Sequence, residues 1–414
     1  MIFNSLFPQS FVFLISILFC TAIDLYSTPP MGWSSINFVS DPDACIQQRK
    51  RCVGEFVMEH ISNALVTRSF CALGYRLVDL DLHWLSRSRD TSSGTLNVDR
   101  NRFERGMKSL GDRLHIKGIV PMVKITTSDS FVENHVATLS EWGIRAVTVD
   151  ASSLISPNEK DYLSKFSDLF RQHDDPAYIA CSGGYMTIDY ETFPDRVNWT
   201  RILSACNSWR LIQDQPDIWY GITRQIDMMR MYDSLFYSLV GPGRFNDLGL
   251  LRVGDGRLTW EQQRSQMALW CLFASPLFFS VDIARSDDAT LELLKNTRLI
   301  KINQDKGVRM PMFVGMSDEV QHWSRELFDL PNSWAIAVFN EGSQNKQIKF
   351  TLCKMLIRRN GMMPPLFKVT DVISGKDIPD PLDLFTEIAV SLAPHQTVMY
   401  HVRHISTETI EPDV

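Results

Sequence analysis

The 414-residue sequence has no run of basic residues, although it holds 42 Lys and Arg against 48 Asp and Glu. Scattered cations do not form the continuous positive patch that a phosphate backbone needs, so nucleic acid is not an expected partner. The net charge of −6 and the 44% share of apolar residues are ordinary for a globular chain. A chain of this length has material for one large core and a smaller second domain.

Several short catalytic and ligand-binding motifs are also missing. The sequence has no His-x-x-x-His and no Cys-x-x-Cys, so its nine dispersed His residues do not indicate a metal site. It has no Gly-x-Ser-x-Gly, which lowers the case for a serine hydrolase. No Gly-x-Gly-x-x-Gly turn opens a helix, and neither internal repeats nor low-complexity segments are present. We expect neither a metal ion nor an organic cofactor.

The N-terminus lacks charge between Asn4 and Asp24. Residues 11–20 (FVFLISILFC) form an apolar run that the small pair Thr21-Ala22 follows. This pattern is typical of a signal peptide, residues 1–22, which implies the secretory route and a lysosomal or extracellular destination. The missing positive charge leaves an uncleaved anchor as the alternative, but the run is short for a bilayer span. We therefore expect no membrane span after cleavage.

Cysteines and one sequon agree with this route. Removing the signal leaves seven cysteines, an odd number in which not all can pair. Cys45 with Cys52, and Cys181 with Cys206, are candidate disulfides, and buried free thiols are the alternative. The remaining three lie in apolar-periodic stretches, where a free thiol behaves as a small hydrophobe. Asn198-Trp199-Thr200 is a candidate glycosylation site in a loop-like stretch.

What the sequence does contain, up to about residue 300, is an alternation of strand-like and helical segments. The predicted strands are residues 30–38, 76–84, 118–125, 145–152, 177–182, 202–210, 243–251 and 276–282. Helical apolar spacing separates them, as at residues 55–65, 131–142 and 260–274. Eight such units in about 270 residues predict a (β/α)8 TIM barrel. An open doubly wound sheet is the competitor and normally has fewer strands.

Near residue 304 the sequence pattern changes to an alternation of apolar and polar residues. Alternating runs cover residues 333–340, 346–352, 367–372, 387–392 and 397–402. Period-two alternation is typical of antiparallel strands with one face buried. We therefore predict a barrel domain over residues 23–303 and a C-terminal antiparallel β-sandwich domain over residues 304–414.

Polar residues gather at the ends of the predicted barrel strands, where the chemistry of a TIM barrel lies. They are Trp33, Asp81, Lys124, Asp150, Ser182, Arg210, Asn246, Asp247 and Asp282. Each of these residues could instead have a purely structural role. Asp150 either points a carboxylate into the barrel mouth or caps the next turn. Trp33 is either a wall for a sugar ring or a core residue, and Arg210 either holds a ligand hydroxyl or carboxylate or pairs with an aspartate.

Several of these segments resemble one known family in the same order along the chain. They are TPPMGW (residues 28–33), GYRLVDLDLHW (74–84), HIKG (115–118), CNSWR (206–210), GPGRFND (241–247), QMALWCLFASPLFFSVD (266–282) and INQD (302–305). Together they resemble the lysosomal α-galactosidase and α-N-acetylgalactosaminidase family, glycoside hydrolase family 27. The resemblance implies the Cys45–Cys52 and Cys181–Cys206 disulfides and a sequon near Asn198.

The family's retaining mechanism uses two carboxyl groups, a nucleophile and an acid/base. Asp150 matches the nucleophile position. The acid/base is the second acid of an Asn-Asp-Pro-Asp segment, which here reads Asn246-Asp247-Leu248-Gly249. Gly249 therefore occupies the acid/base position, and Asp247 matches the first, non-catalytic acid.

Other departures surround the same pocket. Where the family has an Asp-Asp pair that holds galactose hydroxyls, this chain has Asp81-Leu82, and Thr148 replaces a Lys two residues before the nucleophile. Lys124 stands in place of a Tyr. Features that match for substrate binding are Trp33, Asp81 and Arg210, together with Ser182 of the N-acetylgalactosaminidase branch.

Three hypotheses follow. In the first, the protein binds a terminal α-linked sugar or glycan but hydrolyses it weakly or not at all, and acts as a glycan-binding or regulatory pseudo-enzyme. In the second, it is an active retaining α-glycosidase of altered specificity that removes galactose or N-acetylgalactosamine from glycolipids and glycoproteins with a relocated acid. In the third, it is a non-catalytic subunit in a homodimer or in a heterodimer with an active homologue.

Overall fold

The computed structural model describes most of the chain outside the N-terminus and several loops. The described residues are 26–38, 45, 52–81, 84–86, 95–126, 131–150, 162–173, 177–182, 197–212, 218–329, 331–356, 366–379 and 381–405. The predicted signal peptide, residues 1–22, lies outside them. No helix in the described ranges is both long and apolar enough to cross a bilayer.

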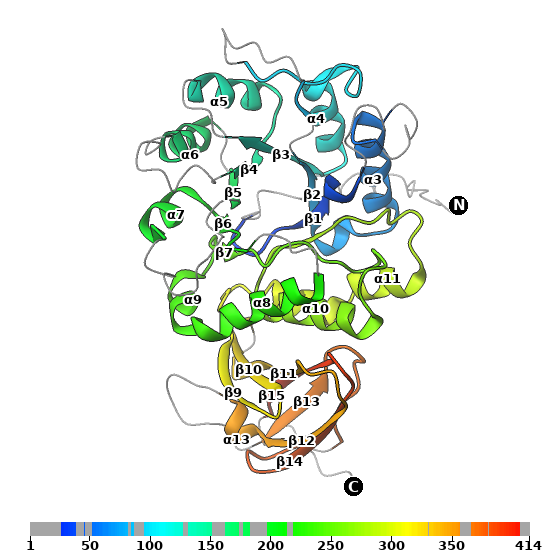
Figure 1. Ribbon diagram of the computed structural model, residues 1–414, viewed down its shortest axis with the longest axis vertical. Coiled ribbons are helices and arrows are strands. Elements are labelled where there is room, and N and C mark those ends of the chain that lie inside the picture. The colour runs from blue at the N-terminus through cyan, green and yellow to red at the C-terminus, as the bar shows by residue number, and fades with distance from the viewer. Residues whose placement is uncertain are drawn as a thin grey trace, which may run out of the picture.

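Eight parallel strands form the first domain, as predicted. They are β1 (Met31–Ser34), β2 (Tyr75–Leu80), β3 (Val120–Thr126), β4 (Ala146–Asp150), β5 (Tyr178–Ser182), β6 (Ser208–Trp209), β7 (Phe245–Asn246) and β8 (Leu277–Phe279). Their order in the sheet is β7-β6-β5-β4-β3-β2-β1-β8. A parallel bridge between Leu251, after β7, and Phe279 of β8 joins the two ends of this order. The curled sheet is the barrel that the alternating pattern predicts (Figure 1).

Helices surround this sheet. They are α3 (Glu55–Thr67), α4 (Gly106–Ile116), α5 (Val132–Glu141), α6 (Tyr162–His173), α7 (Trp199–Ala205), α8 (Ile218–Met231), α9 (Asp233–Leu239), α10 (Trp260–Leu272), α11 (Asp288–Leu294) and α12 (Thr297–Asn303). Most are amphipathic, but α10 buries nearly its whole circumference, because it lies between the barrel strands and the second domain (Figure 1). Thr259 begins α10 with a capping box, in which its side chain and that of Gln262 each bond the other's backbone N–H.

One predicted strand, residues 202–210, is wrong over its first half. Residues 202–205 belong to α7, and only Ser208–Trp209 form a strand. The side chain of Asn198 accepts a hydrogen bond from the backbone N–H of Arg201 and so caps the helix. A short apolar run such as Ile-Leu-Ser-Ala suits a buried helix as well as a strand, and here the cap decides between them.

The second domain consists of two antiparallel sheets. One has the order β13-β15-β11-β10-β9, and the other pairs β12 with β14. Their strands are β9 (Met312–Ser317), β10 (Val320–Leu327), β11 (Ser333–Asn340), β12 (Lys346–Thr351), β13 (Phe367–Asp371), β14 (Glu387–Leu392) and β15 (Thr397–His404), with α13 (Leu352–Met355) after β12. Apolar side chains from both sheets form one core, so the predicted sandwich is confirmed. Strands β9 and β10 were not predicted.

The junction of the two domains contains a buried ion pair. Arg325 of β10 is 1% exposed and donates hydrogen bonds to the carbonyls of Cys271 and Leu272 at the end of α10. Its Nη2 lies 3.6 Å from Oδ2 of Asp305. Asp305 Oδ1 accepts the backbone N–H groups of Phe328 and Asp329. These bonds fix the sandwich against the barrel.

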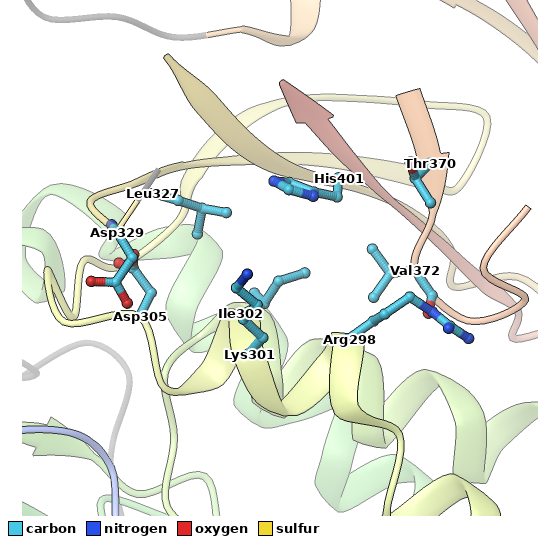
Figure 2. A pocket seen from close by; sticks show the side chains of 9 residues that line it. All are labelled: Arg298, Lys301, Ile302, Asp305, Leu327, Asp329, Thr370, Val372 and His401. Atoms are coloured by element: carbon cyan, nitrogen blue, oxygen red, sulfur yellow. The ribbon is translucent and has the colours of Figure 1, made fainter. Parts of the chain in front are cut away.

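A cavity of about 190 Å³ lies beside this ion pair. Figure 2 shows α12 on one side of it, with Arg298, Lys301 and Ile302, and strand residues Thr370 and His401 on the other. Arg298 bonds the carbonyls of Val372 and Ile373, which makes it a second tie between the domains.

Candidate active site

The strand ends of the barrel enclose a cavity of about 90 Å³. Its lining comes from most of the barrel strands and the turns after them: Ser34, Ile36, Asp79, Asp81, Met122, Lys124, Thr148, Tyr178, Ala180, Cys181, Ser182, Arg210, Asp247, Gly249, Leu250 and Phe278. One water needs roughly 10–15 Å³ by this measure, so the cavity has room for a small polar ligand group and several waters. We call it the mouth cavity.

Asp81 and Lys124 form an ion pair in the mouth cavity. Lys124 Nζ lies 3.3 Å from Asp81 Oδ1, and the two side chains are 25% and 21% exposed. Asp81 directly follows β2, and Lys124 lies on the neighbouring β3. Because the pair neutralises a carboxylate that the resemblance assigns to sugar binding, Lys124 competes with a ligand for Asp81.

Asp79 also faces the mouth cavity, two residues before Asp81 on the same side of β2. Its Oδ2 accepts a hydrogen bond of 2.8 Å from the hydroxyl of Ser34, while its buried Oδ1 has no hydrogen-bond partner among the described residues. Burial raises the pKa of Asp79 to about 7, although the hydrogen bond from Ser34 lowers it. Asp79 and Asp81 therefore both line the cavity.

Gly249 lies in the mouth cavity with its backbone in the left-handed region, at a φ of 91°. Its N–H donates to Asp247 Oδ1 at 2.7 Å, and its carbonyl accepts from the indole N–H of Trp270 at 2.8 Å. A Cβ at this position would meet Nη2 of Arg210 and would lie 2.9 Å from Cζ and 3.2 Å from Nε of the same side chain. The guanidinium of Arg210 therefore fills the space in which a side chain at 249 would begin.

Strand β5 brings Ser182 and a disulfide to the cavity. Cys181 pairs with Cys206, as predicted, and links the end of β5 to the segment between α7 and β6. The carbonyl of Cys181 accepts the backbone N–H of Arg210 at 2.9 Å. Ser182, the next residue, lines the cavity, and its buried Oγ has no hydrogen-bond partner in the part of the chain that the structure describes. Ser182 and Arg210 thus reach the cavity from adjacent strands, which the disulfide and this backbone hydrogen bond link to each other.

Three described residues from the predicted ring do not line the mouth cavity, and one of them, Asn246, is buried with its Nδ2 3.1 Å from Sδ of Met229. Trp33 is fully buried, donates its indole N–H to the carbonyl of Val281 and packs against Phe38, so it occupies the core and offers no stacking wall. Asp282 instead lies 3.1 Å from His60 and 3.6 Å from Arg285.

Some predicted site residues fall where side chains are not described. Asp150 is the last residue of β4, paired in register with Thr126 and Ser182, so its backbone is at the cavity end of the sheet. Its side chain, like Leu82 and the segments 151–161 and 183–196, lies outside the described residues. The nucleophile role of Asp150 stays a prediction.

Two other predicted features lie outside the mouth cavity. Cys45 and Cys52 are disulfide-bonded, as predicted. Asn198 is exposed at the start of α7, so its amide is accessible from solvent, and its glycosylation stays a prediction.

The described lining contains groups that can hold a ligand, and Arg210 cannot take the place of a carboxylic acid in catalysis. Arginine stays protonated at all working pH values and therefore cannot donate a proton as a carboxylic acid does. Three aspartates, Lys124 and Arg210 supply hydrogen-bond acceptors and donors around a partly apolar floor of Met122 and Phe278. This mixture suits a hydroxylated ligand.

Comparison with known proteins agrees with this geometry. Residues 28–305 match the family model described as alpha galactosidase A, and residues 317–402 match the alpha galactosidase C-terminal beta sandwich domain. The chain is 27% identical to alpha-N-acetylgalactosaminidase of Gallus gallus over 395 residues, 91% of this chain and 94% of that one. It is 25% identical to human alpha-galactosidase A over 364 residues, 85% of this chain and 83% of that one.

Solved structures share the fold. Alpha-galactosidase I from Mortierella vinacea matches with a TM-score of 0.77 and 20% identity, over 92% of this chain and 98% of that one. A putative alpha-galactosidase from Bacteroides fragilis matches with a TM-score of 0.76 and 24% identity, over 91% of this chain and 80% of that one.

Proposed function

The chain belongs to the alpha galactosidase A family, and from this membership we propose that it binds a terminal α-linked sugar but hydrolyses α-galactosides weakly or not at all. The observation that carries the proposal is the pair Gly249 and Arg210. At the position that the family resemblance assigns to the acid/base there is no side chain, and a guanidinium fills the space.

The size of the expected loss follows from the chemistry. A retaining glycosidase uses one carboxyl group first to protonate the leaving oxygen and then to activate water. General acid or base participation contributes typically ~10²–10⁴-fold. An alkyl glycoside has a poor leaving group, and its departure depends on that proton. The phenolate of an activated aryl glycoside departs without being protonated. Residual activity on aryl substrates is therefore expected to exceed that on natural ones.

Turnover of nitrophenyl α-galactoside and nitrophenyl α-N-acetylgalactosaminide by purified protein tests the proposal. We expect rates far below those of active family members, and a thermal shift with galactose or N-acetylgalactosamine as evidence of binding. Asp150→Asn is the control, because it removes the proposed nucleophile. Robust wild-type turnover that Asp150→Asn abolishes would overturn the proposal.

Two carboxyl groups support an active enzyme of altered specificity as the second candidate. Asp79 and Asp247 both line the mouth cavity, although Asp247 already accepts the backbone N–H of Gly249. If either replaced the missing acid, Asp79→Asn or Asp247→Asn would remove the alkaline limb of a measurable pH–rate profile, where deprotonation of the acid lowers the rate. Unchanged profiles in both variants would exclude Asp79 and Asp247 as that acid.

We also propose that the protein follows the secretory route. Two disulfides support this, because such bonds persist in oxidising compartments. Expression in cultured animal cells, with and without Asn198→Gln, tests it: an endoglycosidase should increase the gel mobility of the wild type only. Equal mobility of the untreated proteins would argue against occupancy of Asn198.

A further inference from the structure

The cavity at the domain junction is about twice as large as the mouth cavity, at about 190 Å³ against about 90 Å³. We call it the interdomain cavity. Residues of α12 line it on the barrel side, and residues of β10, β13, β15 and the turns after β10 and β13 line it on the sandwich side (Figure 2). One water needs roughly 10–15 Å³ by this measure, so the cavity has room for a compact organic molecule. Small-molecule sites occur preferentially at such domain interfaces.

Aliphatic side chains form part of the wall of the interdomain cavity. They are Ile302, Leu327 and Val372, and all three are buried. A small-molecule site usually combines such an apolar wall with a few polar groups that fix the orientation of the ligand. The charged and polar residues of the lining therefore indicate which class of ligand the cavity would take.

Two cations of α12 line the interdomain cavity, and neither has an acidic partner among the described residues. Arg298 donates hydrogen bonds to the backbone carbonyls of Val372 and Ile373. Lys301, one turn later, makes no hydrogen bond or ion pair within the part of the chain that the structure describes. Figure 2 shows its side chain directed into the cavity, toward the ring of His401 on β15. An anion in the cavity would give Lys301 a partner.

The two acids of the lining are engaged elsewhere. Asp305 belongs to the junction ion pair, with its Oδ2 3.6 Å from Arg325. Asp329 is exposed and accepts the backbone N–H of Lys306 at 3.3 Å. Neither carboxylate lies within ion-pair distance of Lys301, so the charge of Lys301 remains available to a ligand.

His401 lies in a positively charged environment. Burial, together with the positive charges of Arg403 and Lys301, lowers the pKa of His401 to about 4, so the ring is neutral at pH 7. Charges that disfavour a proton on the ring favour an anion beside it. Nε2 of His401 lies 2.6 Å from the hydroxyl of Ser333. When Ser333 donates to Nε2, the neutral ring carries its proton on Nδ1 and can donate it to that anion.

We propose that the interdomain cavity binds a small organic anion, whose carboxylate Lys301 and His401 hold and whose compact apolar body packs against the aliphatic wall. Lys301 is exposed and His401 is half-buried, so a ligand can reach both side chains. The ligand would contact α12 of the barrel and two strands of the sandwich at once, and would therefore stabilise the folded chain by mass action. The interdomain cavity shares no lining residue with the mouth cavity, so the inference does not depend on the proposed sugar-binding function.

Isothermal titration calorimetry of the full chain at low ionic strength tests the inference. The probes are benzoate and hexanoate, and benzamide and hexanamide are their neutral counterparts of nearly the same shape. We expect at least one carboxylate to bind about tenfold more tightly than its amide, because hydrogen bonds to a charged acceptor are the stronger ones. Lys301→Met keeps the length of the side chain and should remove most of that preference. His401→Phe should weaken binding of the carboxylate about threefold.

Two further variants separate this site from general attraction to a basic surface. Lys306→Met is the matched control, because Lys306 is also an exposed lysine at the junction but does not line the interdomain cavity. It should leave the affinity unchanged. Thr370→Trp places a large side chain in the cavity from the edge strand β13 and should abolish binding of carboxylates and amides alike. Circular dichroism shows whether each variant is folded.

The results that would overturn the inference are specific. One is the absence of saturable binding of both carboxylates to the wild type. Another is equal affinity for carboxylate and amide, which would indicate a neutral apolar site. Binding that folded Thr370→Trp leaves intact would place the ligand elsewhere. A loss in Lys306→Met as large as that in Lys301→Met would mean unspecific attraction to exposed lysines.

Discussion

Two arginines in different parts of the molecule have opposite surroundings. At the domain junction, Arg325 is buried against two carbonyl oxygens and lies 3.6 Å from Asp305. At the barrel mouth, Arg210 extends into the space beside Gly249, where the family resemblance expects an acid. The junction arginine has an acidic partner and two carbonyl acceptors, whereas at the mouth a guanidinium lies beside Gly249, at the position that the resemblance assigns to the acid/base. The residues that tie the two domains together are thus different from the residues that line the mouth cavity.

The largest effect should come from the junction. Arg325→Ala leaves Asp305 without its buried partner and the carbonyls of Cys271 and Leu272 without a donor. Breaking one side of a buried pair typically costs about 3–5 kcal/mol. We therefore expect urea denaturation to show a loss of that size in the free energy of unfolding.

An exposed pair provides the control for this prediction. Lys349 and Glu387 lie 3.0 Å apart with side chains 66% and 62% exposed, so Lys349→Ala should cost no more than about 1 kcal/mol. Equal effects of the two substitutions would mean that the junction pair is not a special structural tie.

The second effect concerns the disulfide that borders the mouth. Cys181 and Cys206 are 25 residues apart, and a loop of this order is worth about 3 kcal/mol in the chain-entropy model. Cys181→Ala with Cys206→Ala should lower the melting temperature more than the same change at Cys45 and Cys52, which are only 7 residues apart. A larger loss at the shorter loop would contradict this ranking.

The third effect is smaller and tests the contact between the two mouth residues. Gly249→Ala should cost about 1–3 kcal/mol, because alanine is strained at a φ of 91° and its Cβ would displace Arg210. Gly256→Ala is the matched control, since Gly256 has a φ of 77° and nothing within 4 Å of the added Cβ. We expect chemical denaturation to give the larger cost at 249.

A double-mutant cycle isolates the contact. In an Arg210→Ala background, the cost of Gly249→Ala should fall to that of Gly256→Ala, because only the backbone strain remains. An undiminished cost would show that Arg210 does not occupy the space at 249.

Much of the fold was predictable because its signals are local. Helical apolar spacing and the later change to alternation indicated the barrel and the sandwich. Strand β10 was missed because it buries Gln321 and Arg325 among its residues, so apolar alternation is absent where the strand meets the barrel. The first half of the sixth predicted strand is wrong because Asn198 caps a helix there, and apolar spacing alone does not indicate that cap.

For the candidate site, the sequence predicted which residues lie at the strand ends but not the contacts that their side chains make. The sequence placed Asp81, Lys124, Ser182 and Arg210 at the mouth, where the structure has them. Three features of the site depend on tertiary packing. They are the direction of the Arg210 side chain, the pairing of Lys124 with Asp81 and the burial of Trp33. No local pattern reports those contacts.

We propose that Gly249 leaves this scaffold without its catalytic acid, and the dependence of kcat/KM on the leaving group tests that proposal. We compare kcat/KM for a dinitrophenyl α-galactoside, a nitrophenyl α-galactoside and a methyl α-galactoside. The account predicts that kcat/KM, where it is measurable, falls steeply as the leaving group becomes less acidic, with no detectable turnover of the methyl glycoside. A shallow dependence, with measurable hydrolysis of the methyl glycoside that Asp150→Asn abolishes, would show that an acid is present after all and would contradict the account.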